Sequence, residues 1–280
     1  MMEPMPIINA AEHAWVIHDP RFPIIPEEAS CGDFLVPKSE YSAEHLIAEM
    51  QIYGIDKTVI SHVCYYGRNN DYTIYTVQTW PDRFAGIGLL VGHNLFDPRD
   101  PANVDRLEHL IKVQSLVGLR LSPTYDKDRV WFNDTCMYPL WEKAQELGAA
   151  FNIFPAPEQI YQVADMAERF PGVKVVIDHI AMIDITAPDK AGFGPLLAMH
   201  QLPNVYVRTT LHNLSYEALP YRDVWPFLKR LYDAYGPEHM LFANFFELLI
   251  IKDLIPFFSD EDKRWILGGT AEGIYFRNEG

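Results

Sequence analysis

Residues Ile7-Ile8-Asn9-Ala10-Ala11-Glu12-His13-Ala14-Trp15 form a short, mostly apolar run that ends in an acid and a histidine. Such a run is typical of a strand that is buried on both faces of a parallel sheet. Comparable short apolar runs follow along the chain, near Val59, Ala85, Val117, Phe151, Val175, Val205 and Leu241. The fold therefore has to accommodate eight buried strands.

Helix signals separate most of these runs. Ser42 is a candidate N-cap for a helix that Gly54 would end, and Gly148 would end a helix that begins near Tyr138. Strands that alternate with helices predict a parallel sheet with crossover helices. Eight such units in 280 residues favour a closed α/β fold, a (β/α)8 TIM barrel, with residues 1–280 as a single domain. The alternative is an open doubly wound sheet, but the glycine-rich phosphate-binding turn after its first strand is missing.

The composition narrows the class of partner. The chain is 49% apolar, which suits a large core, and its net charge is −15. Binding to nucleic acid needs clustered Lys and Arg, so we expect no nucleic-acid partner. The apolar segment 240–258 is interrupted by Asn244, Glu247, Lys252 and Asp253, so we expect no membrane span.

The N-terminal residues and the cysteines bear on the compartment. No basic region followed by an apolar run marks a signal peptide near the N-terminus. Cys31, Cys64 and Cys136 are far apart and odd in number, which favours reduced thiols over a disulfide or zinc framework. We therefore expect a cytoplasmic protein.

Side chains with chemical potential follow several of the predicted strands. In a barrel the active site lies where the carboxyl ends of the strands meet. Residues at these ends include His13, His62, Arg120, His179 and Arg208. Acids such as Glu12 and Asp178 lie at the same ends. Histidines, an acid and two arginines converging at one edge are typical of a metal site combined with an anion clamp.

Five segments in this order resemble the amidohydrolase-related family. They are Ile8 to Trp15 followed by Asp19-Pro20-Arg21-Phe22, Trp80-Pro81-Asp82-Arg83-Phe84, Val117-Gly118-Leu119-Arg120, Val176-Ile177-Asp178-His179, and Asn204-Val205-Tyr206-Val207. The resemblance covers essentially the whole chain. It implies a distorted TIM barrel and an origin among metal-dependent hydrolases and decarboxylases, although a shared fold does not establish a function.

The ligand positions that the resemblance implies are only partly retained. The first ligand of strand one falls on Ala11, while His13 remains, and the histidine that ends strand six is present as His179. The ligands expected on strands five and eight fall on Phe154 and Phe245. We therefore expect a depleted, degenerate metal site whose cavity the two rings fill. The cofactor is then either none or one divalent metal (Zn, Mn or Fe) held by His13 and His179.

The remaining polar residues define the candidate site. We expect catalytic roles for His13, His179 and Glu247. We expect substrate binding by Arg120, Arg208, His62 and His212. Each residue also has a structural interpretation, since buried polar groups must be paired: the histidines would be satisfied by hydrogen bonds, and the arginines would pair with nearby acids.

Three functions remain open from the sequence. The first is a subunit of a hetero-oligomer with a metal-bearing amidohydrolase-fold paralogue, such as one half of a two-subunit hydroxylase, with Leu248 to Ile251 as a candidate interface. The second is a self-sufficient hydrolase or decarboxylase of a small carboxylate, in which Arg120 or Arg208 clamps the carboxylate. The third is a small-molecule binding protein that uses the barrel mouth without turnover.

Overall fold

The computed structural model describes residues 5–25, 37–90, 96–126, 131–187 and 192–276. Its centre is a sheet of eight parallel strands in the order in which they occur along the chain. The strands are β1 (Ile8–Glu12), β2 (Lys57–Ser61), β3 (Phe84–Gly88), β4 (Gly118–Leu121), β5 (Ala150–Ile153), β6 (Lys174–Ile177), β7 (Val205–Thr209) and β8 (Met240–Phe242). All eight runs predicted from the sequence are strands.

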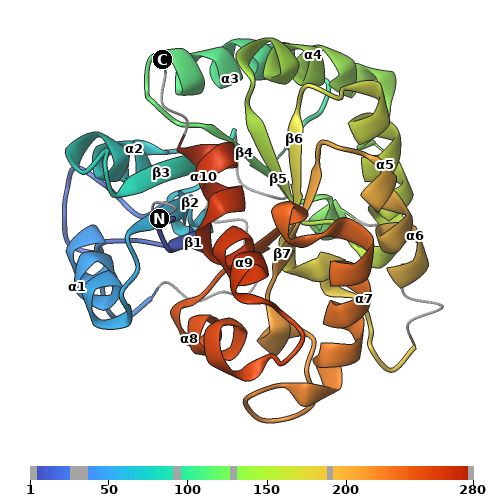
Figure 1. Cartoon of the computed structure of the whole chain (residues 1–280). Coiled ribbons are helices and arrows are strands. Elements are labelled where there is room, and N and C mark those ends of the chain that lie inside the picture. The colour runs from blue at the N-terminus through green and yellow to red at the C-terminus, as the bar shows by residue number, and fades with distance from the viewer. Residues whose placement is uncertain (1–4, 26–36, 91–95, 127–130, 188–191, 277–280) are drawn as a thin grey trace.

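Helices connect the strands and lie outside the sheet (Figure 1). The α-helices are α1 (Ala43–Tyr53), α2 (Asp71–Thr79), α3 (Ala102–Lys112), α4 (Tyr138–Leu147), α5 (Ile160–Arg169), α6 (Phe193–Ala198), α7 (Trp225–Tyr235), α8 (Phe245–Leu249), α9 (Asp260–Arg264) and α10 (Thr270–Tyr275). Ser42 caps α1 by accepting a hydrogen bond from the His45 backbone N–H, and left-handed Gly54 ends this helix. The predicted (β/α)8 barrel is confirmed.

The barrel is nearly closed, because β1 and β8 lie next to each other. The Asn244 backbone N–H, just after β8, donates a hydrogen bond of 3.0 Å to Oδ1 of the fully buried Asn9 in β1. At the amino ends of the strands, Ala271, Ile274 and Tyr275 of α10 pack with Ile8 and the other small apolar side chains inside the barrel. Helix α10 therefore closes one end, which leaves the carboxyl ends of the strands for a site.

The segment after β8 belongs mainly to the core. Leu248, Ile250 and Ile251 are buried in the chain's own fold, whereas Leu249 is half exposed. The expectation that Leu248 to Ile251 as a whole forms an interface is therefore wrong for three of the four residues, because helix α8 and the following π-helical turn (Ile250–Leu254) direct them inward.

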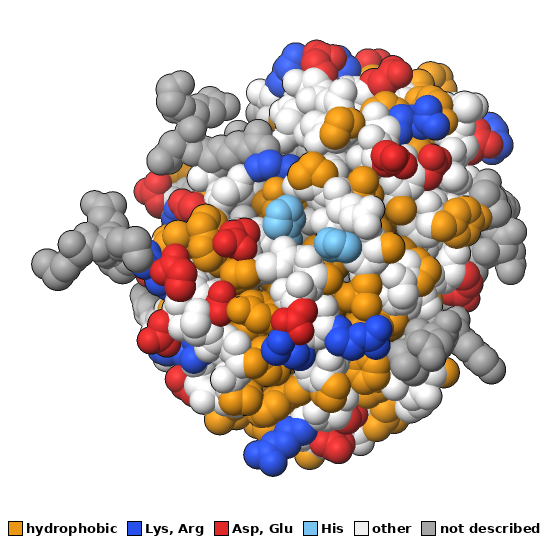
Figure 2. All heavy atoms as spheres, turned by 45° about the vertical axis from the view of Figure 1, so that its right-hand side comes forward, with side chains coloured by type: hydrophobic (Ala, Val, Ile, Leu, Met, Phe, Trp, Pro, Cys, Tyr) orange, Lys and Arg blue, Asp and Glu red, His pale blue; other side chains and the backbone are white. Residues whose placement is uncertain are grey.

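Two other features bear on the sequence-based expectations. Cys136 is free and Cys64 is disulfide-bonded, so the expectation of reduced thiols is wrong for Cys64. Among the helices within the described ranges, none has the length and apolar character needed to cross a bilayer. On the face shown in Figure 2, lysine and arginine side chains are scattered among acidic and apolar ones.

Candidate functional site at the barrel mouth

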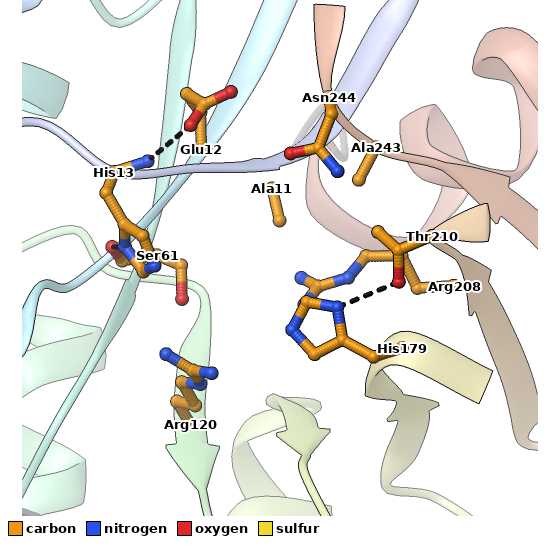
Figure 3. A pocket seen from close by; sticks show the side chains of 10 residues that line it. All are labelled: Ala11, Glu12, His13, Ser61, Arg120, His179, Arg208, Thr210, Ala243 and Asn244. Atoms are coloured by element: carbon orange, nitrogen blue, oxygen red, sulfur yellow. Dashed lines mark hydrogen bonds between the residues drawn. The ribbon is translucent and has the colours of Figure 1, made fainter. Parts of the chain in front are cut away.

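A small cavity lies at the carboxyl ends of the strands (Figure 3). Its volume is about 50 Å³. This barrel-mouth cavity is lined by Ala11, Glu12, His13, Ser61, Arg120, His179, Arg208, Thr210, Ala243 and Asn244. Four of the residues predicted for the site therefore come together: His13, Arg120, His179 and Arg208.

Two arginines, Arg120 of β4 and Arg208 of β7, share one buried acid. Nη2 of Arg208 lies 3.0 Å from Oδ2 of Asp178, and Nε of Arg120 lies 3.6 Å from the same oxygen. Arg208 is only 2% exposed and Asp178 is fully buried. Burial raises the pKa of Asp178, whereas Arg208 and Arg120 lower it. One carboxylate facing two guanidinium groups leaves an excess positive charge at the cavity.

Several donor atoms around the cavity have no hydrogen-bond partner in the described part of the chain. They are Nε of Arg120, Nε and Nη1 of Arg208, and Oγ of Ser61. Buried polar groups are normally paired, because an unpaired donor costs about 1–3 kcal/mol. These donors therefore mark a place where an anionic group or ordered water completes the hydrogen bonding.

His13 is held in one tautomer. Its Nδ1 lies 2.7 Å from the Ser61 carbonyl oxygen, and a carbonyl can only accept, so Nδ1 carries the proton. Burial, followed by the charge of Arg120, lowers the His13 pKa to about 4. At neutral pH the imidazole is uncharged, which leaves Nε2 as an acceptor.

His179 is placed by an unusual backbone. His179 to Met182, directly after β6, all have φ between 49° and 54°, a left-handed turn that costs roughly 1–2 kcal/mol per non-glycine residue. Its Nε2 lies 3.4 Å from Nη2 of Arg208, which can only donate, so Nδ1 carries the proton and donates to Thr210 Oγ1 at 2.8 Å. Nδ2 of Asn213 lies 3.0 Å from Nδ1, so this tautomer requires the Asn213 amide to be turned so that its oxygen faces the ring. Burial, with Arg208 and Arg120, lowers the His179 pKa well below its usual value.

Glu12 lines the site, although it is not among the residues predicted from the sequence for catalysis or substrate binding. A regular strand directs Glu12 away from His13, but the β1–β2 register shifts between Asn9 and Glu12, and Glu12 lines the cavity. Burial raises its pKa to about 7, although its Oε1 accepts a hydrogen bond from the His13 backbone N–H at 3.2 Å. Glu12 can therefore hold or release a proton near neutral pH. Its place directly before His13 is the sequence signal that could have found it.

His62 does not support the predicted substrate-binding role. The side chain is fully buried outside the set of cavity-lining residues. Its Nδ1 lies 3.0 Å from Thr73 Oγ1, and its Nε2 lies 3.2 Å from the Gly67 carbonyl oxygen. Burial lowers the His62 pKa to about 3. One ring nitrogen contacts α2 and the other the loop after β2, so neither is available to a substrate.

Glu247 and His212 pair with each other beside the cavity. Oε1 of the buried Glu247 accepts hydrogen bonds from His212, at 3.1 Å from the backbone N–H and 2.8 Å from Nδ1. Neither residue is among those that line the barrel-mouth cavity. The roles predicted for them, catalysis by Glu247 and substrate binding by His212, have no contact with this cavity, because α8 directs Glu247 toward His212.

The two phenylalanines expected to fill the cavity lie elsewhere. The Phe154 ring packs edge-on against His179, with ring centroids 5.1 Å apart, and Phe245 packs against Tyr53. After β8, Ala243 and Asn244 line the cavity in place of Phe245, because Asn244 has φ 74° and turns the chain. No group of three or more His, Cys, Asp or Glu side chains in the described ranges is arranged to hold a metal ion.

Comparison with known protein families identifies the family of this chain. The Amidohydrolase family matches residues 40–277. The chain belongs to this family. No curated protein matches the sequence.

Solved structures share the barrel at low sequence identity. A probable 2-pyrone-4,6-dicarboxylic acid hydrolase from Acinetobacter baumannii, with citric acid bound, is 15% identical with a TM-score of 0.76, over 98% of this chain and 100% of that one. An amidohydrolase from Burkholderia multivorans with bound zinc is 17% identical with a TM-score of 0.77, over 98% and 100%. The 5-carboxyvanillate decarboxylase of Sphingomonas paucimobilis is 19% identical with a TM-score of 0.66, over 98% and 100%. At these identities the likeness establishes the fold.

Proposed function

We propose that this amidohydrolase-family chain binds a small carboxylate at the barrel mouth and acts on it as a hydrolase or decarboxylase. The observation that carries the proposal is the pair Arg120 and Arg208, which have buried donor atoms without hydrogen-bond partners among the described residues and whose charge exceeds that of Asp178. Guanidinium groups bind carboxylates through charge-assisted hydrogen bonds, often two at once. The similar structures named for a dicarboxylic acid hydrolase and a carboxyvanillate decarboxylase support the same substrate class.

The residues around the bound carboxylate would handle protons. Nε2 of His13 is an uncharged acceptor that can orient a water molecule or receive a proton, and its low pKa makes it a weak base. Glu12, with a pKa of about 7, can supply or accept a proton on the other side. His179 holds the guanidinium of Arg208 in place.

The donor set does not fit a tightly bound divalent metal. Such an ion needs about three protein ligands, and although Glu12, His13 and His179 line the cavity, no three His, Cys, Asp or Glu side chains in the described ranges are arranged to hold one. Nε2 of His179 faces a guanidinium group at 3.4 Å, and the two arginines would repel a cation. The loss of metal ligands inferred from Ala11 therefore remains part of the proposal. The two arginines supply the positive charge that a metal ion would otherwise supply.

Calorimetric titration of straight-chain carboxylates, from acetate to hexanoate, tests the proposal. We expect the carboxylates to bind and the matching carboxamides, which lack the charge, to bind at least about tenfold more weakly. Arg120→Gln should weaken carboxylate binding by a similar factor, whereas the exposed control Arg106→Gln should not. Equal binding of carboxylates and carboxamides, or an unchanged affinity in Arg120→Gln, would refute the carboxylate site. Zinc should leave the unfolding temperature unchanged.

A subunit of a hetero-oligomer is the second candidate function. It is favoured by exposed apolar side chains on neighbouring helices: Ile52 on α1, which contacts α8, and Phe246 and Leu249 on α8. Large exposed apolar groups often mark protein interfaces. In such a complex a metal-bearing amidohydrolase-fold paralogue would hold the metal site. Co-expression with a paralogue followed by size-exclusion chromatography tests it, and a chain that stays monomeric and turns over substrate alone would count against it.

A binding protein without turnover is the weaker alternative. It would use the same two arginines, so carboxylate titrations do not separate it from an enzyme. Product formation from a bound carboxylate ester or aryl carboxylate would exclude it.

A further inference from the structure

A second pocket adjoins the barrel-mouth cavity. Its volume is about 420 Å³, which lies in the range of small-molecule sites. This acidic–aromatic pocket is lined by Glu12, Trp15, Ser39, Glu40, Tyr41, Glu49, Tyr53, Asn244, Phe245 and Phe246. Two of these residues, Glu12 and Asn244, also line the barrel-mouth cavity.

The charge of the pocket is negative. Among the lining side chains that the structure describes, three are glutamates and none is Lys, Arg or His. Oε1 of Glu40 accepts hydrogen bonds from the backbone N–H groups of Ile17 and His18, which lower the Glu40 pKa. Glu49 accepts a hydrogen bond from the hydroxyl of Tyr41. A cationic group entering this pocket would meet carboxylates without a competing cation in the wall.

The walls of the pocket are aromatic. Trp15 and Tyr41 have ring centroids 5.3 Å apart, and Tyr53 and Phe245 have centroids 5.5 Å apart. Phe246 is 41% exposed at the edge. Aromatic faces attract organic cations within about 6 Å, and they also accept the alkyl part of an alkylammonium group. Carboxylates combined with several aromatic faces therefore favour an organic cation over a metal ion.

The barrel-mouth cavity is too small to hold a whole metabolite. At about 50 Å³ it accommodates a carboxylate group and little more, whereas typical ligand sites measure roughly 300–1,000 Å³. In Figure 3, Glu12 and Asn244 lie on the side of the cavity away from Arg120. These are the two residues shared with the acidic–aromatic pocket. The remainder of a ligand whose carboxylate meets the arginines would therefore extend into that pocket.

We propose that the ligand of this chain is a small carboxylate that also carries an alkylammonium group. Its carboxylate completes the buried donor atoms of Arg208 and Arg120 that lack hydrogen-bond partners in the described ranges, and its ammonium group lies among Glu49, Glu40 and the aromatic rings. The inference rests on the proposed carboxylate site and adds the second charge of the substrate. The two regions then recognise the two ends of one dipolar molecule.

Titration with ω-aminocarboxylates of increasing chain length tests the inference. Each is compared with the alkanoate and the alkylamine of the same length, so the unknown span between the two charges does not have to be assumed. We expect at least one ω-aminocarboxylate to bind about tenfold more tightly than its alkanoate. Every alkylamine should bind more weakly than the ω-aminocarboxylate of its length, because it leaves the arginines unpaired.

Charge-neutral variants locate the second charge. Glu49→Gln keeps an acceptor for Tyr41 and should remove the advantage of the amine while leaving alkanoate affinity unchanged. Glu40→Gln is a second variant with the same expected direction. Glu44→Gln, an exposed position on the same helix as Glu49 that does not line the pocket, is the matched control and should change neither affinity. Thermal unfolding checks that each variant is folded.

The outcomes separate this inference from the carboxylate site. If alkanoates bind but no ω-aminocarboxylate binds more tightly, the ammonium subsite is overturned and the carboxylate site stands. If alkanoates fail to bind while alkylamines bind, the carboxylate site and the dipolar ligand are both overturned. An amine advantage that survives in Glu49→Gln and Glu40→Gln also overturns the assignment of the ammonium group to this pocket.

Discussion

The barrel-mouth cavity and the acidic–aromatic pocket share Glu12 and Asn244 but are built in opposite ways. The cavity is small and positively charged, and its arginines come from strands inside the barrel. The pocket is larger and negatively charged, and its glutamates come from the segment before α1, from α1 and from β1. The charges of the cavity are buried and both arginines face Asp178, whereas those of the pocket are partly solvated. Charge at the two sites should therefore differ in its effect on stability.

The largest expected effect follows from removal of Arg208. Arg208→Met leaves the fully buried Asp178 with Arg120 at 3.6 Å, and breaking a buried ion pair typically costs about 3–5 kcal/mol of the free energy of unfolding. Urea unfolding at neutral pH measures the loss. In the pocket, Glu49→Gln should cost less than about 1 kcal/mol. Equal losses of unfolding free energy in Arg208→Met and Glu49→Gln would contradict the difference between the buried cavity charges and the partly solvated pocket charges.

The next effect concerns the pH dependence of Glu12. Its pKa rises from 4.5 to about 7 on folding, so between these values the folded chain holds a proton that the unfolded chain has released. The contribution of Glu12 to the free energy of unfolding is therefore fully present below pH 4.5 and is lost as pH rises through 7. Relative to Glu12→Gln, the unsubstituted chain should lose about 2 kcal/mol across this window, a value reduced from 1.36 kcal/mol per pKa unit because Glu12 is only partly buried.

Glu40 supplies a control of opposite sign in the same pocket. Its pKa is lowered on folding by the backbone N–H groups that it binds, so its contribution is present at higher pH and is lost as pH falls. Relative to Glu40→Gln, the unsubstituted chain should therefore gain stability with rising pH. Denaturant titrations measure the Glu12 slope between pH 4.5 and 7 and the Glu40 slope below pH 4.5. Slopes of the same sign would contradict the assignment of Glu12 as the buried acid.

The smallest expected effect comes from the backbone. Met182 ends the left-handed turn beside the cavity and has φ 49°, whereas Ile52 lies in the regular helix α1 beside the pocket. Met182→Gly should be more stable than Met182→Ala by about 1 kcal/mol, since glycine adopts a left-handed conformation without strain. Ile52→Gly should be less stable than Ile52→Ala by a similar amount. Thermal unfolding of the four variants measures the contrast, and a destabilising Met182→Gly would show that the turn is not strained.

The barrel could be predicted from the sequence because short apolar runs and helix stop signals recur locally along the chain. The same pattern placed His13, Arg120, His179 and Arg208 at one edge, and all four line the cavity. Predictions for residues beyond the strand ends were less successful. His62 contacts α2 and the loop after β2, and Glu247 of α8 is paired with His212, because the conformation of the segment beyond a strand decides where such side chains point.

The sequence by itself determined the alternation of strands and helices, the family and the strand ends that carry the polar residues. Only the tertiary structure decided the charge of the site: that Arg120 and Arg208 share Asp178, that a register shift brings Glu12 to the cavity, and that Phe245 lines a second pocket instead of filling the first. The physical reason is the distance along the chain over which each property is set. Hydrophobic periodicity is read along neighbouring residues, whereas a buried charge takes its pKa and its partners from strands that are far apart in the chain.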